Sequence, residues 1–130
     1  MKQDCESGAR AVEYGLNTAR QIASILGGTK VGYSRSNEYR IRNKVIAIKC
    51  AKLKNDSVGV SYQMLERLDA IWGAFEGEDG SYDLYEMTPD TFKNHMRPTR
   101  STGPSAGRVG IVKRSWFLNA GTFLETVKLQ

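Results

Sequence analysis

The chain has 130 residues, 40% of them hydrophobic and 25% charged, with a net charge of +5, so one compact domain over residues 1–130 is expected. No stretch approaches the roughly 20 apolar residues that span a bilayer, and residues 1–6 lack the apolar run of a signal peptide, so we expect a cytoplasmic protein without a membrane partner. One histidine and no Cys-x-x-Cys exclude the usual zinc sites, and any metal would be a hard, carboxylate-bound ion such as Mg²⁺.

The N-terminal half predicts one helix and three strands. In residues 7–26 apolar residues recur at spacings of three and four, and glycines follow at 27–28, which indicates an amphipathic helix with a stop. The three strands cover residues 30–36, 38–42 and 44–52. A short turn at residues 42–43 separates the last two. The third strand is almost continuously apolar, which is typical of a central strand covered on both faces.

The C-terminal half predicts a second helix and a series of shorter elements. After a polar link at residues 53–59, a wide apolar stripe over residues 61–75 indicates the second helix. Thr88 precedes Pro89 as a helix cap. A strand at residues 82–87 and a helix at 89–96 come next, followed by a loop at 97–107. The chain then forms a strand at 108–113, a short helix at 115–119 and a last strand at 122–129.

This order predicts the fold class. A helix, three strands, a helix and a strand form the core, and a C-terminal strand appendage follows it. We therefore expect an α/β or α+β protein in which helices pack on a mixed sheet.

Charge is distributed in blocks along the chain. Residues 30–54 carry eight basic groups and one acid, residues 55–90 carry nine acids and one base, and residues 91–130 carry a net +6. Two basic segments that meet in space form a positive face, which is typical of a protein that binds a phosphate backbone. The alternative is a solvated surface without a partner.

Lys49 is the one charge in the apolar third strand. An unpaired ammonium is costly to bury, so Lys49 needs an anionic partner or a place at an edge. Glu38, the one acid in residues 30–54, lies one strand earlier across a short turn. We expect the two side chains to lie on the same face of adjacent strands.

The sequence resembles the PD-(D/E)xK nuclease superfamily, which includes many type II restriction endonucleases, over residues 7–87. The resemblance lies in the element order and in Asn37-Glu38 followed by Ile46-Ala47-Ile48-Lys49. It implies a restriction-endonuclease-like fold and Mg²⁺-dependent hydrolysis of phosphodiester bonds in DNA. Glu38 would hold the metal, and Lys49 would be the motif lysine.

The second acid of the motif falls on Ala47, which cannot ligate a metal. In this superfamily the missing acid is sometimes supplied from another element, and Glu13 on the first helix is our candidate for the second metal ligand. The predicted catalytic set is therefore Glu38, Lys49 and Glu13. A salt bridge between Glu38 and Lys49 in an inert sheet is the alternative.

The loop after the third helix predicts phosphate contacts. Arginines, small hydroxyls and glycines are what such contacts use, and residues 97–115 contain five basic groups and no acid. The candidate nucleic-acid-binding residues are Arg97, Arg100, Ser101, Arg108, Lys113 and Arg114. An exposed loop with solvated arginines is the alternative.

Three functions remain open. The first is a metal-dependent DNA endonuclease, which would call for a two-fold dimer if it cuts both strands symmetrically. The second is a module that binds nucleic acid, with DNA favoured, and does no chemistry. The third is a protein-interaction domain whose basic and acidic blocks pair between subunits.

Overall fold

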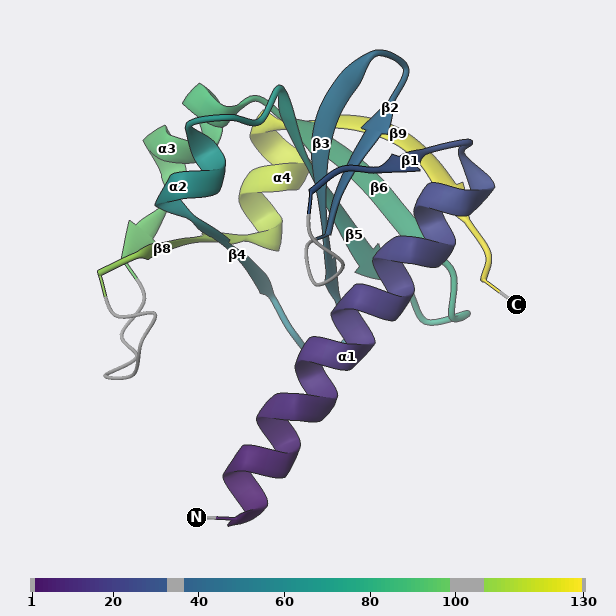
Figure 1. Ribbon diagram of the computed structural model, residues 1–130, viewed down its shortest axis with the longest axis vertical. Helices are drawn as coiled ribbons and strands as arrows, with labels where there is room; N and C mark the ends of the chain where they lie inside the picture. Colours follow the sequence, from purple (N-terminus) through teal and green to yellow (C-terminus); the bar gives the residue numbers. More distant parts are fainter. Residues whose placement is uncertain (1, 33–36, 99–106, 130) are drawn as a thin grey trace.

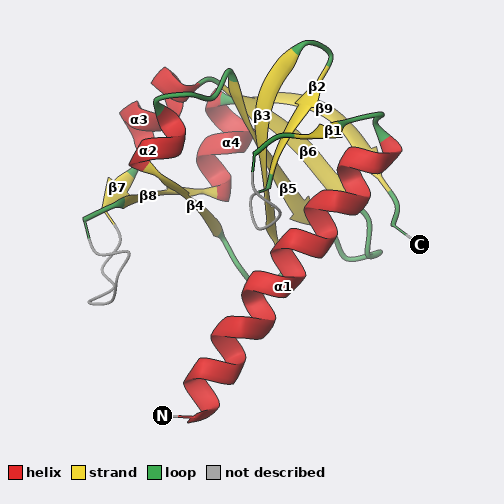
Figure 2. Ribbon diagram, viewed as in Figure 1, coloured by secondary structure: helices red, strands yellow, loops and turns green. Residues whose placement is uncertain are grey.

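The computed structural model describes residues 2–32, 37–98 and 107–129, with side chains described from Val12 onward. In these ranges four helices and nine strands build a mixed α/β fold (Figures 1 and 2). The helices are α1 (Lys2–Ile25), α2 (Tyr62–Leu65), α3 (Pro89–His95) and α4 (Arg114–Ala120). The strands are β1 (Thr29–Lys30), β2 (Glu38–Ile41), β3 (Lys44–Ala51), β4 (Ser57–Ser61), β5 (Ala70–Glu76), β6 (Tyr82–Met87), β7 (Arg97–Pro98), β8 (Val109–Lys113) and β9 (Thr122–Val127).

The strands form two sheets. The larger has the order β1-β2-β3-β5-β6-β9, and the smaller has the order β4-β8-β7. The pair β3 and β5 is parallel, whereas the other pairs are antiparallel. Parallel neighbours need a crossover connection, which β4 and α2 supply. The larger sheet is thus mixed, as the sequence predicted.

Both faces of the larger sheet are covered. α1 lies on one face, and α2, α3 and α4 with the smaller sheet lie on the other (Figure 1). The α1 face buries, among others, Ala19, Ile22, Ala23, Ile46, Ile48 and Trp72. The opposite face buries, among others, Ala47, Ile71, Phe75, Phe92, Val112 and Phe117. No helix in the described ranges is long and apolar enough to cross a membrane.

Two turns have backbone conformations that fix the chain path. Gly27 has φ +73° just after α1, and its left-handed conformation ends the helix. Arg42 and Asn43 have φ +54° and +68°, so the β2–β3 hairpin closes with two left-handed residues, the conformation that suits a two-residue hairpin turn. This turn places Glu38 opposite Ala47.

Most predicted elements are confirmed. β2, β3, β6, α3, β8, α4 and β9 match their predicted ranges to within two residues at each end. The Thr88 cap is confirmed, because its hydroxyl accepts a hydrogen bond from Thr91 N at 3.1 Å. α1 begins at Lys2, earlier than predicted. β1 is Thr29–Lys30, so among the described residues it shares only Lys30 with the predicted 30–36 strand, and residues 33–36 lie outside the described ranges.

The predicted second helix at residues 61–75 is wrong. The structure has the single helical turn α2 and then the strand β5, whose residues are buried up to Phe75. The apolar residues at 71, 72 and 75 fit a helical stripe, but they also belong to a continuous apolar run, and periodicity alone does not separate these cases. Pairing with β3 and β6 on both sides decides for a strand.

Three further predictions need correction. Part of the polar link at residues 53–59 belongs to β4. The predicted loop at residues 97–107 begins with β7. The C-terminal strand is not an appendage to the core, because β9 pairs with β6 in the larger sheet.

Candidate functional site

Glu38 and Lys49 lie on adjacent strands and on the same face of the sheet. Glu38 is opposite Ala47 in the β2–β3 register, and Lys49 is two residues beyond Ala47. Side chains two apart on a strand share a face, and Ala47 packs in the cluster that faces away from α1. The predicted juxtaposition is therefore confirmed.

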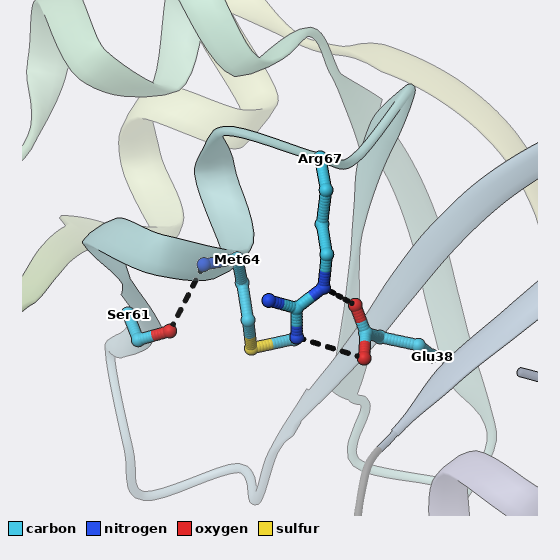
Figure 3. Close-up of polar contacts among 4 residues, drawn as sticks. All are labelled: Glu38, Ser61, Met64 and Arg67. Atoms are coloured by element: carbon cyan, nitrogen blue, oxygen red, sulfur yellow. Dashed lines mark hydrogen bonds and ion pairs between the residues drawn. The ribbon is translucent and has the colours of Figure 1, made fainter. Parts of the chain in front are cut away.

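Arg67 binds both carboxylate oxygens of Glu38. Its Nε donates to Glu38 Oε1 at 2.8 Å and its Nη2 donates to Oε2 at 3.1 Å, so both carboxylate oxygens accept a hydrogen bond from one guanidinium (Figure 3). The Glu38 side chain is 5% exposed and that of Arg67 is 55% exposed. This contact satisfies a carboxylate that is otherwise costly to bury.

The local structure after β4 positions Arg67. Ser61 ends β4, and its hydroxyl accepts a hydrogen bond from Met64 N at 3.2 Å, which caps α2. Arg67 N then donates to Met64 O at 3.0 Å in the turn that follows α2. Arg67 was not among the candidate residues predicted from the sequence, although it is the one base among residues 55–90, because the segment was interpreted as a long helix.

Lys49 is half-buried and close enough to Glu38 to be influenced by its charge. Burial lowers the pKa of the Lys49 ammonium, and the negative charge of the Glu38 carboxylate partly offsets that effect. The ion pair that Glu38 makes within the described ranges is with Arg67 and not with Lys49. The alternative of a Glu38–Lys49 salt bridge is therefore wrong.

The described side chains do not fit a Mg²⁺ site at this place. Ala47 supplies no ligand, and both oxygens of Glu38 are bound by Arg67. Glu13 is exposed on α1, the helix that covers the face opposite the Glu38 carboxylate. Within the described ranges no group of three or more His, Cys, Asp or Glu is placed to hold a metal ion.

Three of the predicted nucleic-acid-binding residues lie exposed around the smaller sheet. Arg97 begins β7 and pairs in register with Ile111 of β8. Arg108 precedes β8, and its carbonyl accepts a hydrogen bond from Tyr62 N at 2.8 Å. Lys113 ends β8. Arg100 and Ser101 lie outside the described ranges.

Arg114 makes contacts within the protein that join distant segments of the chain. Its Nη2 donates to Lys52 O at 3.3 Å and to Asn55 O at 3.1 Å, and its backbone N donates to Asp56 O. The guanidinium carbon lies 5.0 Å from the centre of the Phe75 ring. Arg114 thus fastens the start of α4 to the loop between β3 and β4, a role that sequence reasoning missed.

His95 and Trp116 form an aromatic pair beside the exposed basic residues. Their ring centres are 4.2 Å apart and their planes are tilted by 44°. His95 Nδ1 lies 2.9 Å from Thr91 O, and because a carbonyl only accepts, Nδ1 carries the hydrogen. Trp116 is 43% exposed. Trp116 was not among the candidate residues predicted from the sequence.

The comparisons with known proteins give no family for this chain: no protein-family model and no curated protein matches the sequence. The candidate residues must therefore be judged by their own geometry and chemistry.

Proposed function

We propose that the protein binds nucleic acid, with DNA favoured, through a surface formed by α3, β7, β8 and the start of α4. We call it the basic surface, and it contains Lys93, Arg97, Arg108 and Lys113. One observation carries the proposal. Residues 91–124 contain six lysines and arginines and no acid, and the fold gathers the described part of this run around one small sheet.

The chemistry of these side chains supports a phosphate-backbone partner. Arginine and lysine supply charged donors that fit phosphate oxygens. Arg97 and Lys113 are exposed at β7 and at the end of β8, and both strands are held in the smaller sheet. The pairing fixes the strands without using these side chains, which remain directed to solvent.

The test is binding to a labelled DNA duplex at several salt concentrations. Affinity should fall steeply with salt, because each neutralised phosphate releases counterions, with a log-log slope of about −0.9 per contact on duplex DNA. Arg97→Gln and Lys113→Gln should each weaken binding and reduce the slope by roughly one contact. Arg20→Gln is the matched control, because Arg20 is exposed on α1 on the opposite side of the larger sheet. Binding that is unchanged by salt and by all three variants would reject the proposal.

A Mg²⁺-dependent DNA endonuclease is the second candidate function. It is supported by the shared face of Glu38 and Lys49 and by the order of α1, three strands, a crossover and β5, which parallels the superfamily that the sequence resembles. The described carboxylates do not complete a metal site, so we derive no catalytic step.

Plasmid cleavage tests this second candidate. Purified protein is incubated with plasmid DNA and either Mg²⁺ or EDTA, and this candidate function requires cleavage with Mg²⁺ that Glu38→Gln abolishes. Glu66→Gln serves as the control, because the Glu66 carboxylate is 75% exposed and pairs with Lys93 of α3. If the protein binds DNA but cleaves it with no divalent metal, the endonuclease function is rejected and only the binding function remains.

A further inference from the structure

Trp116 is exposed although a neighbouring aromatic residue on the same helix is fully buried. On α4, Phe117 is 0% exposed and contacts Phe92 of α3, with ring centres 6.3 Å apart. Trp116 points elsewhere, against His95 at the end of α3, and keeps 43% of its surface in contact with solvent. The other tryptophan, Trp72, is 2% exposed in the core.

The His95 ring gives Trp116 a fixed support. The hydrogen bond from Nδ1 to Thr91 O anchors the imidazole to α3, and the 4.2 Å ring contact then restrains the indole. The Phe92–Phe117 ring contact joins α3 and α4, the two helices that carry His95 and Trp116. The result is a rigid aromatic surface that is partly open to solvent.

Positive charge surrounds this pair along the chain. Lys113 lies three residues before Trp116, and Arg97 lies two residues after His95. Two exposed acids lie on or beside these elements: Asp90 is in the first turn of α3, and Glu66 Oε1 lies 3.7 Å from Lys93 Nζ. An exposed ion pair of this kind is weak and does not neutralise the region. The aromatic pair therefore belongs to the basic surface.

We propose that Trp116, supported by His95, stacks an unpaired base, so that the preferred ligand of the basic surface is single-stranded nucleic acid. This inference rests on the proposed function and adds its substrate class. Proteins that bind single strands combine cations along the backbone with exposed aromatic rings for the bases. In a duplex the bases are already stacked on one another, so an exposed indole contributes little there. The excess of basic over acidic side chains on these elements favours a polyanion over a protein as the occupant.

The test uses about twelve-nucleotide oligothymidylate, an abasic strand of the same length and a duplex of matched length. Binding is followed by tryptophan fluorescence, which reports on Trp116 because Trp72 is buried. Oligothymidylate should quench the fluorescence and the abasic strand should not. Trp116→Ala should weaken oligothymidylate binding by roughly tenfold or more and leave duplex and abasic binding unchanged.

Two variants serve as controls. Trp116→Phe keeps an aromatic ring and should retain most of the single-strand preference, and it also serves if Trp116→Ala fails to fold. Leu118→Ala removes an apolar side chain that is 50% exposed on the same helix, roughly 200° around from Trp116, and should change nothing.

The outcomes separate this inference from the proposed function. The stacking proposal is overturned if the abasic strand binds as well as oligothymidylate. It is also overturned if Trp116→Ala weakens single-strand and duplex binding equally. In both cases the proposal that the basic surface binds nucleic acid remains. If no nucleic acid binds the wild-type protein, both proposals fail. Self-association that Trp116→Ala abolishes would then identify the pair as a protein contact.

Discussion

The Arg67 guanidinium bridges β2 and the turn after α2 by binding both oxygens of Glu38. The two residues are 29 positions apart in the sequence, and the contact crosses the face of the sheet that carries Ala47. Glu38 is almost fully buried, and the two hydrogen bonds from Arg67 offset part of the cost of burying its negative charge.

Arg67→Ala should lower the free energy of unfolding by about 1–2 kcal/mol, because it leaves a buried carboxylate without its two-point donor. Solvent around the half-exposed arginine keeps the loss below that of a fully buried pair. Arg67→Lys should recover only part of the lost stability, since an ammonium lacks the planar pair of N–H donors with which a guanidinium binds both carboxylate oxygens. Urea unfolding measures all three proteins. Glu66→Ala, which removes an exposed 3.7 Å pair, is the control, and an equal loss there would contradict this account.

Neighbouring residues Lys113 and Arg114 should give opposite results when each is changed to alanine. Arg114→Ala removes two hydrogen bonds to the carbonyls of Lys52 and Asn55 and a ring contact, so it should destabilise the protein by roughly 1–3 kcal/mol. Lys113→Ala removes no such contact among the described residues, so it should change the free energy of unfolding by less than about 0.5 kcal/mol. It should nevertheless weaken DNA binding. Chemical unfolding and a binding titration of both variants check this, and a Lys113→Ala protein as unstable as Arg114→Ala would contradict it.

Local patterns in the sequence were sufficient for several elements. The spacing of apolar residues located α1, and alternation with a two-residue turn located β2 and β3. β5 could not be distinguished from a helix, because its strand character comes from pairing with β3 and β6 on both sides. Apolar runs that are buried on both faces carry no alternation to reveal them.

The candidate site shows the same limit. The hairpin register made the shared face of Glu38 and Lys49 predictable from adjacent segments. The Glu38–Arg67 contact and the bonds from Arg114 to Lys52 and Asn55 join distant parts of the chain. They depend on the crossover through β4 and α2, which a single sequence pattern does not contain.

Cys50 should react slowly with thiol reagents in the folded protein. Burial raises the pKa of its thiol from 9.0 to about 12, so the reactive thiolate is rare at neutral pH. In a Cys5→Ser variant, which leaves one thiol, reaction with a chromogenic disulfide at pH 8 should be at least roughly 100-fold slower than for a small free thiol. In urea the rate should become normal. A native rate close to that of the free thiol would contradict the burial of this side chain.

Lys49→Met should not destabilise the protein at neutral pH. As the pH rises, the free energy of unfolding of the variant should fall relative to that of the wild type. Burial lowers the pKa of Lys49 below its ordinary 10.5, so at neutral pH the folded state bears the cost of a partly desolvated ammonium that methionine lacks. Between the lowered pKa and 10.5 the unfolded chain binds more protons than the folded one, so the wild type gains stability with rising pH, and the variant loses this gain.

The measurement is the difference in free energy of unfolding between Lys49→Met and wild type, from urea titrations at several values from pH 6 to about pH 10. Taking the difference largely removes the contribution of Cys50, whose raised pKa acts in the opposite direction as alkali is added. Lys54→Met, at an exposed lysine, is the control and should show no trend with pH. A large destabilisation by Lys49→Met at pH 7 would mean that the ammonium stabilises the fold through its anionic neighbour Glu38. That result would remove the physical reason for regarding Lys49 as a functional lysine instead of a structural one.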